Sequence, residues 1–153
     1  MIRVQAEDFD IGAELDRLGR DNHAIGGIAS FVGLVRDMAP AGQGGGKIGA
    51  MTLEHYPGMT EKQLAAIEAE ARQRWPLEEC LIIHRYGRLL PGDRIVLVAT
   101  ASAHRQAALE SCAFLIDWLK TRAPFWKLED GPEGGHWVEA KDSDDDAAKR
   151  WNK

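Results

Sequence analysis

The chain has 153 residues, of which 44% are hydrophobic and 28% are charged, a composition typical of a globular protein with one domain spanning residues 1–153. Its 24 acidic residues outnumber its 19 lysines and arginines, and the net charge of −5 argues against a nucleic-acid-binding protein, whose domain is usually basic. No apolar run approaches the roughly 20 residues of a membrane span, and the acidic N-terminus lacks the apolar core of a secretory signal. Two cysteines are too few for a disulfide framework, and no His/Cys spacing suits zinc, so we expect a cytoplasmic protein without a structural metal.

The N-terminal part of the chain predicts a strand, a helix and a second strand. Residues 2–4 are typical of a short edge strand. Residues 10–19 predict a brief amphipathic helix, with Asp10 as its cap and Gly19 as its stop. The glycine-rich but apolar segment 23–37 predicts a long strand with a bend or bulge.

A glycine-rich loop separates that strand from the next. Four glycines between positions 42 and 46 predict a flexible loop over 39–49, and residues 50–56 predict a strand that pairs across the loop as a hairpin with 23–37. The clearest helix follows at 59–75, because its apolar residues recur at helical spacing, and Thr60 is a reasonable cap.

The second half of the chain repeats the strand-then-helix pattern. Residues 79–87 and 93–102 predict strands joined by a Pro-Gly-Asp turn. A second long helix is expected over 103–122, with Ser102 as its N-cap. Because Pro124 disfavours helix at the residue before it, we expect the chain to run extended from there.

The C-terminal end is predicted to hold a last short strand at 136–140 and an acidic tail at 142–153. That tail is either disordered on its own or folded over a site, where Lys149 and Arg150 would add charge. Helices separate runs of strands without strict alternation. The pattern therefore favours an α+β fold with two long helices over a doubly wound sheet.

Two cations stand where a helix begins. His104 and Arg105 follow a strand at the start of helix 103–122, and a helix N-terminus suits an anion. Cations at this end oppose the helix dipole unless an anion lies between them. The alternative is that both side chains point to solvent or pair with a carboxylate. Arg36 closes another strand, where an arginine is usually part of a surface ion pair.

Two lysines flank the extended segment after the second helix. Lys120 lies in the last turn of that helix, where the dipole favours a cation in any case. Lys127 follows Phe125 and Trp126, and aromatic neighbours can desolvate an ammonium group so that it becomes a usable general acid or base. The alternative for Lys127 is an edge-strand lysine that discourages aggregation.

From the residue types alone, these cations predict a pocket with aromatic walls that suits a phosphorylated, flat-ringed small molecule. Its five candidate members are Arg36, His104, Arg105, Lys120 and Lys127. The residue types name no reaction.

Four long segments point to a known family: LEHYPGMTEKQL (53–64), RWPLEECLIIHRYGRLLPGD (74–93), SAHRQAALESCAFLIDWLKTRAPFWK (102–127) and WVEAKDSD (137–144). They closely resemble the large, catalytic subunit of molybdopterin synthase. The resemblance implies an α/β-hammerhead-type fold with an added antiparallel β portion. It also implies a sulfurtransferase that converts cyclic pyranopterin monophosphate (precursor Z) to molybdopterin, without a cofactor.

The same resemblance implies two kinds of partner. A small ubiquitin-like subunit would deliver the two dithiolene sulfurs on a C-terminal Gly-Gly thiocarboxylate, and two large subunits would form the central dimer of a heterotetramer. Phe31 and Ile116 fall where the family lines the channel for the partner's tail.

Site residues also carry over from the family. Lys120 and Lys127 match its catalytic lysines, which also contact substrate. The implied substrate-binding set further contains Leu34, Val35, Arg36, His104, Arg105, Leu128 and Glu129. Leu34 stands where some relatives have lysine, and Leu128 stands where a basic residue is common. Backbone or apolar contacts are expected at these two positions.

Two alternatives to the enzyme remain open at this point. One is a non-catalytic binding module for a phosphorylated pterin or nucleotide, which would need only Arg36, His104 and Arg105. The other is an assembly partner that docks a ubiquitin-like tail without chemistry.

Overall fold

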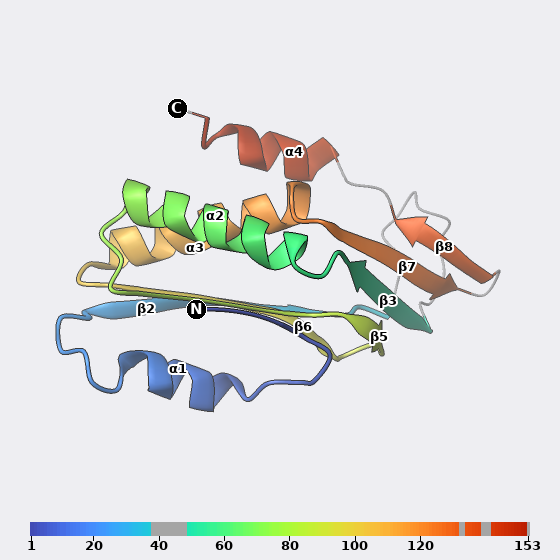
Figure 1. The fold of residues 1–153 in the computed structure, drawn as a ribbon, viewed down its shortest axis with the longest axis horizontal. Helices are drawn as coiled ribbons and strands as arrows, with labels where there is room; N and C mark the ends of the chain where they lie inside the picture. Colours follow the sequence, from blue (N-terminus) through green and yellow to red (C-terminus); the bar gives the residue numbers. More distant parts are fainter. Residues whose placement is uncertain (38–48, 132–133, 139–141, 153) are drawn as a thin grey trace.

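The protein is built around two four-stranded sheets. The computed structural model describes residues 1–37, 49–131, 134–138 and 142–152. Figure 1 shows the main sheet covered by α1 on one face and by α2 and α3 on the other, with the second sheet at one end. This arrangement confirms the predicted α+β class.

The main sheet has the strand order β1-β4-β6-β2. Its members are β1 (Ile2–Gln5), β4 (Glu79–Arg85), β6 (Arg94–Ser102) and β2 (Gly27–Leu34). β1 runs parallel to β4 along one edge, while β4 and β2 both pair antiparallel with the central β6. The predicted edge position of the first strand is confirmed.

The second sheet has the order β5-β3-β7-β8 and is antiparallel throughout. Its members are β5 (Gly87–Leu89), β3 (Ala50–His55), β7 (Phe125–Gly131) and β8 (Gly134–Val138). β7 begins just after Pro124, as the proline rule predicts. Residues 139 and 140 of the predicted last strand lie outside the described residues.

Four helices pack around the sheets among the described residues. They are α1 (Ile11–Gly19), α2 (Met59–Arg74), α3 (Arg105–Thr121) and α4 (Asp142–Lys149). Both long helices lie within one or two residues of their predicted bounds. Asp10 caps α1 as predicted, because its carboxylate accepts from the backbone N–H of Ala13 at 2.9 Å.

Alternation along the buried strand β4 divides the core. Cys80 and Ile82 face α2 and α3, whereas Leu81 and Ile83 face α1. A third, smaller cluster around Leu53 joins the second sheet to the main one. Because β4 is covered on both faces, its sequence is continuously apolar rather than alternating.

The predicted hairpin between 23–37 and 50–56 is wrong. β2 pairs with β6 in the main sheet, and β3 pairs with β5 and β7 in the second sheet. The predicted strand 79–87 is likewise two strands, because the chain changes sheets at Gly87, whose φ of +90° suits glycine. The glycine-rich segment 39–49 lies outside the described residues except for Gly49.

The predicted long strand 23–37 is shorter than expected and carries the expected irregularity. β2 spans Gly27–Leu34, and its register against β6 shifts between Gly33 and Leu34. A Cβ on Gly33 would lie 2.8 Å from Cγ1 of Val96, so glycine allows the two strands to approach at this point.

Two predicted helix caps are also wrong. Gly58, not Thr60, caps α2, and its N–H donates to the Glu61 carboxylate at 2.6 Å. His104, not Ser102, occupies the N-cap position of α3. Ser102 instead ends β6 and donates its hydroxyl to the carbonyl of Pro76 at 2.7 Å.

The acidic tail forms α4, which lies over α2 and α3 (Figure 1). Its charges are paired within this packing: Lys149 binds Asp146, and Arg150 binds Asp117, both at 2.7 Å. Both cations of the tail are therefore paired with aspartates in this chain.

Candidate active site

Strand alternation in β7 sends its side chains to opposite faces of the second sheet. Lys127 pairs with Leu53 and Glu129 pairs with Met51, and both partners belong to the buried cluster that faces the main sheet. Phe125 lies on the same face, two residues before Lys127. The candidate catalytic lysine on β7 is therefore half-buried and directed toward the body of the protein.

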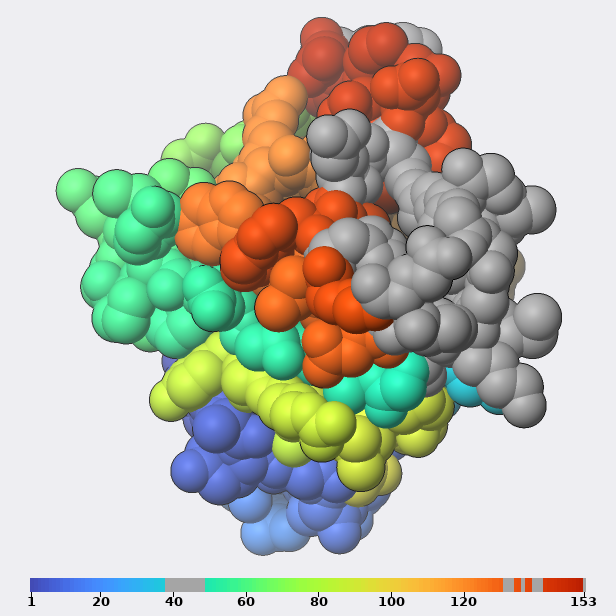
Figure 2. Space-filling model, turned by 90° about the vertical axis from the view of Figure 1, so that its right-hand side faces the viewer, coloured from blue at the N-terminus to red at the C-terminus, as the bar shows by residue number. Residues whose placement is uncertain are grey.

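Trp126 and Leu128 lie on the other face of β7. Trp126 is 42% exposed and meets Tyr56 edge-on, with ring centroids 4.6 Å apart. The expectation that Phe125 and Trp126 both form walls around Lys127 is thus wrong, because successive strand residues alternate in direction. The side chain of Leu128 is also directed away from the face that carries Lys127 and Glu129. Figure 2 looks onto this end of the molecule, where β3 and β7 adjoin at the surface.

A buried histidine lies where the two sheets meet. His84, near the end of β4, is 7% exposed, and its ring stacks on Phe125 with centroids 3.6 Å apart and planes inclined by 15°. Its Nδ1 lies 2.8 Å from the carbonyl oxygen of Arg85. A carbonyl only accepts, so Nδ1 carries the proton and Nε2 keeps a lone pair.

The environment of His84 brings the two candidate lysines into one neighbourhood. Burial lowers the pKa of His84 to about 3, against the opposing hydrogen bond to Arg85, and the charges of Lys127 and Lys120 lower it further. Both ammonium groups thus act on the same buried, uncharged ring. We call Lys120, Lys127 and the ring of His84 the lysine site.

Lys120 reaches the lysine site from α3. It is exposed and lies in the last turn of the helix, where the dipole favours a cation. α3 leads directly into β7 (Figure 1), so one turn of chain separates the elements that carry the two lysines. That the two lysines act together stays a prediction.

The segment after β2 ends near the second sheet. Val35 is 3% exposed and packs in the cluster of Leu53, which is the strand partner of Lys127. Backbone hydrogen bonds hold Val35 on both sides, from its N–H to Asp93 and from Gly92 to its carbonyl. The side chains of its neighbours, Leu34 and Arg36, are exposed at this end of the molecule.

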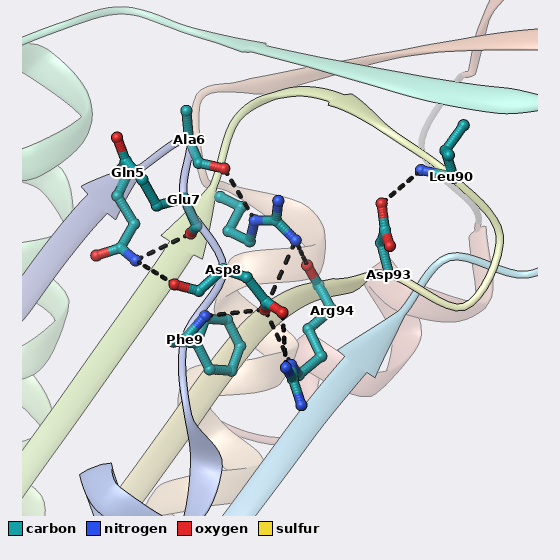
Figure 3. Close-up of polar contacts among 9 residues, drawn as sticks. Gln5, Ala6, Glu7, Asp8, Phe9, Leu90, Asp93 and Arg94 are labelled. Carbon is teal, nitrogen blue, oxygen red and sulfur yellow. Dashed lines mark hydrogen bonds and ion pairs between the residues drawn. The ribbon is translucent and has the colours of Figure 1, made fainter.

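A polar network lies next to the turn that holds Val35, in which the N–H of Leu90 donates to the Asp93 carboxylate at 2.8 Å (Figure 3). Arg94 binds the Asp8 carboxylate through two nitrogens, at 2.6 and 2.9 Å. Arg85 bonds the carbonyls of Ala6 and Arg94, each at 3.0 Å. The hydrogen bonds from Arg94 lower the pKa of Asp8 to about 2, so this clamp is charged on both sides at neutral pH.

His104 and Arg105 do not join the lysine site within one chain. Both are exposed at the start of α3, next to the end of β6. Arg105 and Lys120 lie near opposite ends of the helix, about 22 Å apart along its axis. A single chain therefore does not bring all five predicted cations together, because a helix of this length separates its own ends.

Phe31 and Ile116 lie on neighbouring elements. β2 packs against α3, and Ala29, two residues before Phe31, belongs to the cluster under that helix. Ile116 is one turn before Lys120 and packs against the same cluster. Phe31 remains 39% exposed at the sheet edge. The two proposed channel residues thus flank the interface between β2 and α3.

The residue types did not single out His84, although its ring lies between the two sheets next to β7. The available signal was its spacing of two residues from the buried Ile82 and four from the buried Cys80, which places it on the same face of β4. The contacts of His84 depend on the position of the second sheet, which the sequence did not predict.

The cysteines are core residues. Cys80 and Cys112 are free and buried, and burial raises the pKa of their thiols to about 12 and about 11. Neither thiol is therefore a nucleophile at neutral pH. Within the described residues, no group of three His, Cys, Asp or Glu side chains could hold a metal ion, and no helix is long and apolar enough to cross a membrane.

The fold is that of proteins of molybdopterin biosynthesis. The solved structure named molybdopterin biosynthesis MoaE protein from Burkholderia ambifaria superposes with a TM-score of 0.83 at 52% identity, covering 100% of this chain and 98% of that one. A chain in the complex of subunits 1 and 2 of the molybdopterin-converting factor from Helicobacter pylori has the same fold, with a TM-score of 0.70 at 20% identity over 92% of this chain and 90% of that one.

The sequence comparisons agree with the fold. The profile of the family described as MoaE protein matches residues 4–122. The molybdopterin synthase catalytic subunit of Pseudomonas aeruginosa is 57% identical over 150 residues, which cover 98% of this chain and 97% of that protein. This chain belongs to the MoaE protein family, as its sequence resemblance predicts.

Proposed function

We propose that this chain is the catalytic subunit of a molybdopterin synthase. It converts cyclic pyranopterin monophosphate to molybdopterin by adding two dithiolene sulfurs from the C-terminal thiocarboxylate of a small ubiquitin-like partner. The observation that carries the proposal is the lysine site, where the charges of Lys120 and Lys127 act on one buried ring, in a chain 57% identical to a catalytic subunit.

The two lysines supply electrostatic and proton-transfer catalysis. The thiocarboxylate sulfur adds to the pterin side chain to give a thioester. Water then cleaves its acyl–sulfur bond, which leaves the sulfur on the pterin and a carboxylate on the partner. Negative charge develops in both steps, and a positioned ammonium group stabilises it. Lys127 is half-buried, so its charge is less screened by water than that of the exposed Lys120. Either ammonium can also donate a proton that the transfer requires.

The phosphate of the substrate requires cations in addition to the lysines. Arg36 lies at the same end of the molecule as the lysine site and can clamp a phosphate through two nitrogens. His104 and Arg105 lie at the other end of α3, so we propose that a second copy of the chain, in the central dimer, supplies this pair. Leu34, Val35, Leu128 and Glu129 complete the proposed substrate-binding set.

The partner's tail is proposed to reach the lysines along the β2–α3 interface, past Phe31 and Ile116. A Gly-Gly tail lacks side chains and therefore fits a narrow channel between a helix and a strand. The resulting assembly is a heterotetramer with two large and two small subunits.

Membership of the family also suggests the cell compartment of the reaction and the components that it needs. We propose a cytoplasmic protein of one domain over residues 1–153, which acts on a small molecule and one protein partner without membrane or nucleic acid. Its thiols remain reduced in that compartment, and the sulfur arrives on the partner, so Cys112 has no role in the transfer. No metal or organic cofactor is required for the step.

A single-turnover assay tests the proposal. Purified chain, cyclic pyranopterin monophosphate and thiocarboxylated small subunit are mixed, and dithiolene-bearing pterin is followed for the wild type, Lys120→Ala and Lys127→Ala. We expect product from the wild type and a loss of turnover in both variants that exceeds their loss of affinity. Binding of the pterin without any product in the wild type would favour a non-catalytic binding module instead.

A further inference from the structure

The buried imidazole of His84 has no role in the chemistry proposed above, yet it contacts β7, the strand that carries Lys127. It stands on β4 of the main sheet and stacks on Phe125 of β7 in the second sheet. The groups that act on it electrostatically are Lys127 from β7, Lys120 from α3 and His55 from β3.

Two contacts fix the orientation of this ring. The hydrogen bond from Nδ1 to the carbonyl of Arg85 sets its tautomer and its rotation. The stack on Phe125 is nearly parallel, at 15° with 3.6 Å between centroids, so the two rings share a flat contact. The centroid of the His55 ring lies 6.1 Å from that of Phe125 and 4.6 Å from that of Tyr86.

Phe125 transmits this orientation to Lys127. The two residues lie on the same face of β7, two positions apart, so a contact that holds the Phe125 ring also restrains the strand next to Lys127. β7 starts only a few residues after the end of α3 at Thr121, so the same contact sets the position of Lys127 relative to Lys120.

We propose that His84 is a positioning residue of this site: its uncharged imidazole, fixed by Arg85 and stacked on Phe125, holds the start of β7 so that Lys127 faces the same space as Lys120. An imidazole suits this place better than a cation, since a third positive charge would repel both lysines. The catalytic consequence rests on the proposed function, whereas the structural consequence for Lys127 does not.

The test compares His84→Leu, which loses both contacts, with His84→Phe, which keeps an aromatic ring for the stack. Phe125→Leu removes the other half of the stack, and His23→Gln replaces an exposed histidine as a matched control. Thermal unfolding and circular dichroism verify that each variant is folded. Turnover is measured in the single-turnover assay, and affinity is measured with cyclic pyranopterin monophosphate alone.

We expect His84→Leu and Phe125→Leu to lower the single-turnover rate at least about tenfold, because misplacing a catalytic group by about an ångström has effects of this size. Affinity for the pterin should change less than about threefold, and His84→Phe should recover most of the rate. Rates within about twofold of wild type in both leucine variants would overturn the proposal. So would equal losses of rate and affinity.

A second measurement needs no enzymatic activity. Brief acetylation with an amine-reactive ester, followed by peptide mass spectrometry, gives the labelling of Lys127 relative to the exposed Lys62 on α2. A loosened strand should raise this ratio at least about threefold in Phe125→Leu and leave it unchanged in His23→Gln. If the wild type makes no product but the labelling contrast holds, the proposed function fails and the positioning role stands. An unchanged ratio in Phe125→Leu would overturn the positioning role even if the wild type is active.

Discussion

Acidification should destabilise this protein through His84 over a defined pH range. In the folded state, burial lowers the pKa of His84 from 6.5 to about 3. In the unfolded chain, the imidazole takes up a proton as the pH falls below its ordinary pKa, while the folded state does not. The unfolded state therefore binds more protons between pH 6.5 and about 3, and the free energy of unfolding falls as the pH falls through this range.

The expected size follows from the two pKa values. A difference of one pKa unit corresponds to about 1.4 kcal/mol. At pH 7 the unfolded histidine is mostly neutral and the contribution is small, whereas at pH 5 it is almost fully protonated. Between these two values of pH, His84 should therefore lower the free energy of unfolding by about 2 kcal/mol.

His84→Phe isolates this contribution, because phenylalanine cannot take up a proton in either state. Urea unfolding at pH 7, 6 and 5, followed by tryptophan fluorescence, gives the pH dependence for the wild type, His84→Phe and His23→Gln. The loss from pH 7 to 5 should be about 2 kcal/mol smaller in His84→Phe than in the wild type. Carboxylates contribute equally to the pH dependence of the free energy of unfolding in both proteins, so they cancel in the comparison. Parallel losses in the wild type and His84→Phe would refute the reasoning, whatever the absolute stability of the variant.

Three further predictions concern packing and charge. Gly26→Ala should lower the free energy of unfolding by about 1–3 kcal/mol, since a Cβ there would collide with a backbone carbonyl oxygen. In Gly27→Ala the new Cβ meets no atom within 4 Å, so this control should be close to neutral. Equal midpoints of urea unfolding in the two variants would contradict this prediction. Asp8→Asn should cost about 1 kcal/mol or less at pH 7, because Asp8 is 50% exposed. The low pKa of Asp8, about 2, predicts that this difference shrinks as the pH falls from about 4 toward 2, and a difference independent of pH would contradict the role of the clamp. Trp151→Ala should lower the free energy of unfolding by about 2 kcal/mol and make α4 susceptible to limited proteolysis. The indole of Trp151 donates to Asp117 at 2.7 Å and packs between two helices. Unchanged protease resistance would show that other residues hold α4.

Some of the site could be predicted from residue types, and some required the family resemblance. The helix that carries Lys120 and the extended segment that carries Lys127 follow from local rules. Only the resemblance paired these lysines as catalytic groups, because residue types favoured a capping role for Lys120 and left an edge-strand role open for Lys127. His84 escaped both approaches, since its importance depends on which ring it stacks against.

The sequence by itself determined the local structure of this protein. Helical periodicity, the Asp10 cap and Pro124 located α1, α2, α3 and the start of β7 to within a few residues. These signals act between residues close in the chain, so they can be read without knowing the fold.

Only the tertiary structure decided which strands pair and which side chains meet. β2 and β3 are consecutive strands but lie in different sheets, because backbone hydrogen bonds join strands without regard to sequence order. The stack of His84 on Phe125 depends on that pairing, as does the direction of Lys127 toward the body of the protein. The length of α3 separates Arg105 from Lys120, so one chain cannot bring all five predicted cations together.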